Sequence, residues 1–143
     1  MKYMPTVCVD TNIWFYSLAR PARGEADKHE AARHLIANLD RPLLTPQIIN
    51  ELSFNLLRKR GWSETELREL MGDMRGRCRF FVPDNGWHEA ASLLRERHKL
   101  SFWDSLVLAS ACSAGCERLF SEDMQHGLRI GGLEIINPFI DGT

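Results

Sequence analysis

The sequence lacks the features that mark several classes of protein. No apolar run approaches the ~20 residues that a membrane-spanning helix needs. There is no internal repeat, low-complexity tract or linker-like stretch, so the 143 residues are expected to form a single domain, residues 1–143. The N-terminus carries one Lys and no long apolar run, which argues against a signal peptide. We therefore expect a cytoplasmic protein with no attachment to a membrane.

The chain also lacks a strong excess of either charge, and it lacks paired cysteines. Lys and Arg number 18 against 19 Asp and Glu, and the net charge of -1 excludes a strongly basic nucleic-acid coat but not a local basic groove. The cysteines, Cys8, Cys78, Cys112 and Cys116, form no zinc-type CxxC pair, so we expect reduced, buried thiols. The His residues have no zinc-ligand spacing. No Ser/His or Cys/His nucleophile pattern is present either.

What the chain does contain is a regular alternation of short apolar segments and helical patterns. The predicted strands are Val7–Val9, Pro42–Thr45, Phe80–Val82, Leu119–Ser121 and Leu133–Ile136. The predicted helices cover 13–18, 25–39, 46–60 and 64–77, a segment from Asp84 or Asn85 to about His98, and a segment that begins at Ser101. Short apolar strands separated by helices predict an α/β fold, in which a parallel sheet of five strands is covered by helices on both faces.

Several helix ends carry recognisable capping residues. Thr45 is a favourable N-cap, and Pro46 then occupies the first helical position, where its missing N–H costs nothing. Gly61 is expected to end this helix. Ser63 and Glu66 have the spacing of a capping box, which predicts the start of the next helix.

The stretch Val7–Asn12 is the first candidate functional segment. A short apolar strand leads into Asp10, and an apolar helical pattern follows from Ile13. In α/β proteins, ligands sit outside the carboxyl ends of the parallel strands. The alternative is that Asp10 or Asn12 merely caps the helix that follows. The other acids of the chain bear on this choice.

Three further acids lie at strand–helix junctions or near them. Glu51 is in the second turn of the helix after the second strand, where the alternative is a surface role near the helix N-terminus. Asp104 enters a very apolar helix, and an acid there calls for a reason beyond capping with Ser101. Asp123 follows the fourth strand, and its alternative is a turn residue. Strand alternation does not rank the neighbouring Glu122 against Asp123.

Four segments together carry a family resemblance. They are Val9–Asn12, Asn50–Leu52, Ser101–Ser105 and Ser121–Met124. In this order and spacing they resemble the PIN-domain ribonucleases, and most closely the VapC-type toxins of bacterial toxin–antitoxin pairs. The resemblance covers nearly the whole chain, although no single segment is diagnostic. It implies a PIN-like three-layer α/β/α fold with a central five-stranded parallel sheet.

The resemblance also implies an active site at the carboxyl edge of the sheet. The corresponding catalytic acids of this chain are Asp10, Glu51, Asp104 and Asp123. Of these, Asp10, Asp104 and Asp123 are the expected metal ligands, while Asn12 and Ser121 are expected to support the cluster as polar neighbours. None of the four acidic positions departs from the family pattern, which argues against a non-catalytic member.

The chemistry of carboxylates agrees with this assignment. Hard Mg²⁺ or Mn²⁺ ions prefer carboxylate oxygens, and a metal-bound water is acidic enough to attack a phosphodiester. Without a cation, carboxylates ~4 Å apart repel by about 4 kcal/mol per pair at an effective dielectric near 20. Four acids gathered for structure alone would therefore be a poor solution. We expect a Mg²⁺- or Mn²⁺-dependent endoribonuclease that cleaves single-stranded or loop RNA.

The expected partners follow from charge and from the family. Arg20 and Arg23 come just after the first helix and are the candidates for contacts with RNA phosphates. An open anionic pocket suits a basic side chain, so we expect a small antitoxin protein to insert one at Asp10 and Asp104. A homodimer is also expected, because relatives commonly form one.

Other readings of the same acids stay open. A PIN-domain nuclease that processes RNA without an antitoxin would have the same motifs. A receiver domain would need an adjacent acid pair at the first strand end and a Lys after the last strand, where this chain has Asp10 alone and Asn137–Pro138. A non-catalytic scaffold would not need all four acids.

Overall fold

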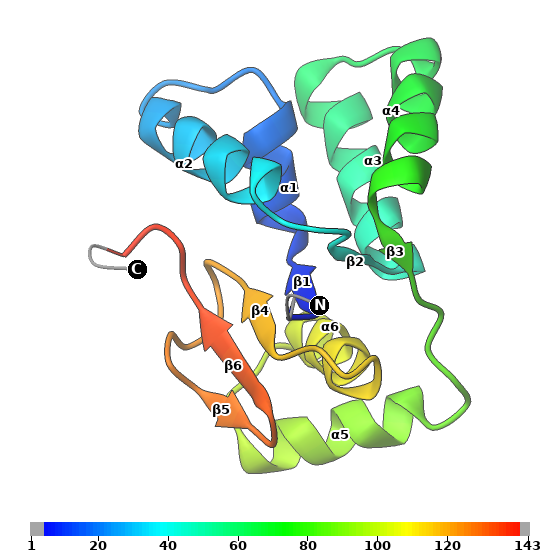
Figure 1. Ribbon diagram of the computed structural model, residues 1–143, viewed down its shortest axis with the longest axis vertical. Coiled ribbons are helices and arrows are strands. Elements are labelled where there is room, and N and C mark those ends of the chain that lie inside the picture. Colours follow the sequence, from blue (N-terminus) through cyan, green and yellow to red (C-terminus); the bar gives the residue numbers. More distant parts are fainter. Residues whose placement is uncertain (1–4, 141–143) are drawn as a thin grey trace, which may run out of the picture.

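The computed structural model describes residues 5–140 and contains a single sheet flanked by helices (Figure 1). Its strands are β1 (Val7–Val9), β2 (Leu43–Leu44), β3 (Arg79–Phe80), β4 (Arg118–Phe120), β5 (Arg129–Ile130) and β6 (Leu133–Ile136). Its helices are α1 (Thr11–Leu18), α2 (Ala26–Ala37), α3 (Pro46–Arg60), α4 (Glu64–Arg77), α5 (Trp87–Arg97) and α6 (Phe102–Ser113). The predicted α/β class is confirmed. None of the helices within residues 5–140 is long and apolar enough to cross a membrane.

The strand order is β3-β2-β1-β4-β6-β5, and the five predicted strands pair in parallel throughout. The prediction of five strands was wrong by one, because β5 adds an antiparallel edge to β6. This edge strand has only two residues, an exposed Arg129 and a half-buried Ile130, so it has no apolar run that a sequence pattern could reveal. The sheet is therefore mixed, with a parallel centre.

The predicted helix caps are confirmed. The Thr45 hydroxyl accepts a hydrogen bond from the Ile48 amide at 3.3 Å, and Gly61 ends α3 in the left-handed conformation with φ 64°. Ser63 and Glu66 exchange both hydrogen bonds of a capping box, at 3.1 and 3.0 Å. Local side-chain chemistry thus fixes where α3 ends and α4 begins.

The start of α5 differs from the prediction, which placed it at Asp84 or Asn85. The helix begins at Trp87, since the Asp84 carboxylate accepts a hydrogen bond from the Gly86 amide at 2.9 Å and closes a turn there. Asp84 is a residue type that favours both turns and caps, and here the turn prevails.

The core lies between the parallel strands and the helices on either side of them. All of β1 is buried, and α6 is buried continuously from Ser105 to Ala111, so it is a core helix. Helix α1 packs against α2 and α3, and α3 packs against α4, while α5 packs on α6 at the other end of the molecule (Figure 1). The four cysteines are free thiols, as expected, and all but the half-buried Cys112 are buried.

Candidate functional site

Asp10 lies where β1 gives way to α1, at the carboxyl end of the sheet. The parallel register pairs Val9 with Phe120, which brings Asp10 beside Ser121 at the end of β4. One carboxylate oxygen of Asp10 accepts from the Thr11 amide at 2.8 Å, and the other accepts from the Ser121 hydroxyl at 3.0 Å. The Asp10 side chain therefore both caps α1 and binds the segment after β4, while only 7% of the residue is exposed.

The burial of Asp10 makes its negative charge costly. Desolvation raises the pKa of Asp10 to about 6, against the opposing effect of the hydrogen bonds from Thr11 and Ser121. The nearby charges of Asp104 and Glu51 raise this pKa further. The charges of two of the three other predicted acids thus act on the Asp10 carboxylate, although these acids come from different parts of the chain.

The remaining acids are linked in the same way. Burial raises the pKa of Glu51; a side-chain hydrogen bond with Gln47 opposes this shift, and the charge of Asp104 adds to it. Burial also raises the pKa of Asp104; contact with Ser101 opposes the shift and the charge of Asp123 adds to it. The four sequence-predicted acids therefore lie near enough for Glu51 and Asp104 to act on Asp10 and for Asp123 to act on Asp104, and such repulsion favours the binding of a cation.

Asp123 and Glu122, the two candidates for the fourth acid, have different partners. The Asn12 amide donates to an Asp123 carboxylate oxygen at 2.8 Å, which ties Asp123 to the start of α1. Glu122 instead forms an ion pair with Lys28 of α2. Since Asp123 acts on the pKa of Asp104, the geometry favours Asp123 as the member of the acidic group.

Glu51 carries an unusual carboxylate oxygen. Its Oε1 atom is buried and has no hydrogen-bond partner among residues 5–140, and the same is true of Oε1 of Gln47, one helical turn earlier. Buried carboxylate oxygens without a donor are rare and call for an explanation, such as a place for a cation or its water ligands. The position of Glu51 therefore fits a metal-binding pocket better than a surface role.

The four acids do not form a compact cage. Across residues 5–140, no three His, Cys, Asp or Glu side chains stand close enough together to make a ready-made metal cluster. Mg²⁺ keeps several of its waters and is commonly held by one or two carboxylates together with substrate phosphates. Carboxylates that lie near one another in pairs, as these four acids do, suit an ion that is held by one or two carboxylates.

The structure does not bring Arg20 and Arg23 to the acids. Both follow the last residue of α1, whereas Asp10 caps its first turn, and an eight-residue helix is ~12 Å long. Both side chains are exposed. If Arg20 and Arg23 bind the RNA, as predicted, they contact phosphates several nucleotides away from the phosphate that lies at Asp10.

Trp103 is an exposed aromatic residue next to the acids that the sequence does not single out from the other tryptophans. The Trp103 residue is 62% exposed, while Trp14 is buried and Trp62 and Trp87 are half-buried. The Gln47 amide donates to the Trp103 carbonyl at 3.2 Å, which joins the first turn of α3 to that of α6. Its place directly before Asp104 is visible in the sequence, but its exposure, which sets it apart from the other tryptophans, is visible only in the packed structure.

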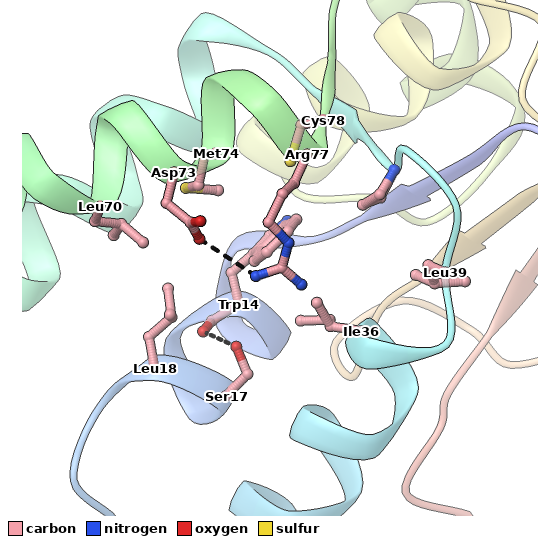
Figure 2. Close-up of a pocket in the computed structure, with 11 residues that line it drawn as sticks. Trp14, Ser17, Leu18, Ile36, Leu39, Leu70, Asp73, Met74, Arg77 and Cys78 are labelled. Carbon is pink, nitrogen blue, oxygen red and sulfur yellow. Dashed lines mark hydrogen bonds and ion pairs between the residues drawn. The ribbon is translucent and has the colours of Figure 1, made fainter.

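A small apolar pocket, lined by none of the four acids, lies between α1, α2 and α4 (Figure 2). Trp14, Ile36 and Met74 are among its lining residues, and the Arg77 guanidinium binds Asp73 at 3.3 Å on its wall. Its cavity volume is about 60 Å³, too small for a nucleotide. The pocket is therefore not the site where a polynucleotide meets the acids.

The fold and this site define a class: an α/β protein with a group of acidic residues near the carboxyl ends of its parallel strands. The sequence profile of the PIN domain family matches residues 7–127, and the chain belongs to that family.

Several solved structures have a similar fold. VapC20 of Mycobacterium tuberculosis, a toxin that cleaves the sarcin–ricin loop, is 21% identical, with a TM-score of 0.63 over 82% of this chain and 92% of its own. A toxin–antitoxin complex from Klebsiella pneumoniae is 16% identical, with a TM-score of 0.69 over 94% and 98%. FitAcB of Neisseria gonorrhoeae is also 16% identical, with a TM-score of 0.61 over 93% and 98%. No curated protein sequence matches the chain. At these identities the likeness establishes a shared fold.

Proposed function

We propose that this chain is a divalent-metal-dependent endoribonuclease and the toxin of a toxin–antitoxin pair. The observation that carries the proposal is the mutual repulsion of Asp10, Glu51, Asp104 and Asp123 at the carboxyl edge of the sheet. Burial and the neighbouring charges raise the pKa values of Asp10, Glu51 and Asp104, which costs stability, and a bound cation removes that cost. Membership of the PIN domain family supports nuclease chemistry at this place.

The proposed roles follow from each side chain's surroundings. Asp10, Asp104 and Asp123 hold Mg²⁺ or Mn²⁺, and Glu51 offers its unpartnered buried oxygen to the ion or its waters. Such an ion, when bound, makes a water acidic enough to attack a phosphodiester and stabilises the leaving oxygen. Asn12 and Ser121 orient the carboxylates by the hydrogen bonds they donate.

The proposed substrate is single-stranded or looped RNA. Unpaired bases stack on exposed aromatic side chains, and Trp103 offers such a surface one residue before Asp104. The test is cleavage of one sequence presented as single-stranded RNA, duplex RNA and single-stranded DNA. We expect cleavage of the single-stranded RNA, at internal phosphodiesters. No cleavage of any RNA, or equal cleavage of DNA, would contradict the proposal.

The proposed partners are a small antitoxin and a second copy of the chain, in the cytoplasm. The similar structures include a toxin–antitoxin complex, and an acidic pocket suits an inserted Arg, whose fork pairs with two carboxylate oxygens. Strong expression of this chain alone should arrest bacterial growth, and Asp10→Asn should relieve the arrest. Unimpaired growth together with RNA cleavage in vitro would favour the alternative, an RNA-processing nuclease without an antitoxin.

A further inference from the structure

Three consecutive residues after β4 are each held by a different element. The Ser121 hydroxyl donates to Asp10 after β1, Glu122 pairs with Lys28 on α2, and Asp123 accepts from Asn12 on α1. Two of these three contacts are with residues of the acidic site. The ion pair of Glu122 with Lys28 is the exception, because Lys28 makes no hydrogen bond or ion pair with Asp10, Glu51, Asp104 or Asp123 among residues 5–140.

Two aromatic rings hold the Lys28 side chain in place. Its Nζ atom lies 5.4 Å from the centre of the Tyr16 ring and 5.6 Å from that of Phe139, and these two rings meet edge to face at 5.5 Å. Lys28 is thereby kept between α1 and the segment after β6 while it pairs with Glu122. The Asn137 amide also reaches the Glu122 carbonyl at 3.5 Å. Glu122 is thus held by both its side chain and its backbone.

The stability of α2 itself does not explain this placement of Lys28. Lys28 lies in the first turn of α2, where a positive charge opposes the helix dipole and an acid is favoured. An exposed ion pair would add little stability, but this one is partly buried, with 38% and 20% of the two side chains exposed. Its partner is 94 residues away in sequence, so the pair joins distant parts of the fold.

We propose that Lys28 is a positioning residue of the acidic site: by holding Glu122 it fixes the direction in which Asp123 faces Asn12 and Asp104. Glu122 and Asp123 are consecutive residues of the bend that follows β4, so an ion pair that holds Glu122 also restrains the backbone that carries Asp123. The ion pair also neutralises Glu122 and keeps a fifth negative charge out of the acidic group. The part of this inference that concerns metal binding rests on the proposed function.

The test compares Lys28→Met, which keeps the apolar stem, with Lys28→Arg, which keeps the charge. Hydrogen–deuterium exchange of residues 121–126 reports on the segment itself, and Mn²⁺ titration without RNA reports on the site. In Lys28→Met we expect exchange in this segment to quicken and Mn²⁺ affinity to fall, each by about three- to tenfold. Lys28→Arg should restore both. Arg129→Met, which breaks the ion pair with Glu134 between β5 and β6, is the control and should change neither.

Unchanged exchange in Lys28→Met would overturn the inference, since the segment would then not depend on Lys28. Faster exchange with unchanged Mn²⁺ affinity would also overturn it, because Lys28 would then only stabilise the fold. A wild-type protein that binds Mn²⁺ and responds to Lys28→Met as expected, yet cleaves no RNA, would support the positioning role and contradict the nuclease proposal. The two failures are therefore distinguishable.

Discussion

At the scale of the residue, Asp10 combines the cap of α1 with a place in the acidic site. A helix N-terminus favours a negative charge, and the amide of Thr11 and the hydroxyl of Ser121 both stabilise one here. Burial nevertheless raises its pKa to about 6. The cost of removing the Asp10 carboxylate from water is thus larger than the stabilisation from its two hydrogen bonds, and a bound cation would offset that cost.

The first prediction concerns the pH dependence of the metal-free protein. Because the pKa of Asp10 rises from 3.8 to about 6 on folding, its contribution to stability is fully present below about pH 4 and is lost as the pH rises through about 6. At ~1.36 kcal/mol per pKa unit, the loss is on the order of 1–3 kcal/mol. Urea unfolding between these pH values should therefore show Asp10→Asn gaining stability relative to wild type. A constant difference across the range would contradict this.

The second prediction concerns Asp104. Replacing it with Asn keeps its size and removes one charge from the acidic group, so the metal-free protein should gain on the order of 1–3 kcal/mol of stability. The same change should abolish cleavage and shrink the rise in Tm on adding Mn²⁺. Thermal melts with and without Mn²⁺ measure both effects, and Asp40→Asn, at an exposed acid between α2 and β2, is the control.

A role for Asp104 in capping alone gives the opposite results. The substitution would then be neutral or slightly destabilising, since the Ser101 hydroxyl would still accept from the amide of residue 104. An unchanged metal-induced shift in the Asn variant would remove Asp104 from the site.

At the scale of the element, local chemistry made most of the fold predictable. The caps at Thr45 and Ser63 and the stop at Gly61 depend on neighbours within one helical turn, so the sequence alone reveals them. The short β5 does not have this property, because its pairing with β6 depends on a turn and on a partner strand. Most helix ends were therefore found from the sequence, apart from the start of α5, whereas the short edge strand β5 was missed.

The third prediction tests one such cap. Ser63→Ala removes the hydroxyl that accepts from the Glu66 amide, and loss of an N-cap of this kind costs about 1 kcal/mol. Chemical denaturation should show this decrease in the free energy of unfolding, while the rate of RNA cleavage stays unchanged. A loss of cleavage in a folded Ser63→Ala protein would mean that α4 takes part in the site.

At the scale of the whole molecule, the site is assembled from residues far apart in the chain. Asp10 and Asp104 could be proposed from the sequence because each interrupts an apolar pattern. Lys28 could not, because its partner Glu122 lies across the fold and a Lys in a helix is ordinarily solvated. The choice of Asp123 over Glu122 likewise required the hydrogen bond from Asn12, which forms only when α1 meets the segment after β4.

The most direct test of this account is the rate of cleavage of a labelled single-stranded RNA as a function of free divalent metal. The purified protein should be inactive in excess chelator and should recover on addition of Mg²⁺ or Mn²⁺, because its carboxylates need a cation to act on a phosphodiester. Asp10→Asn should stay inactive at every metal concentration while remaining folded. Full cleavage in excess chelator, or by the Asp10→Asn protein, would contradict the claim that these acids form a metal-dependent nuclease site.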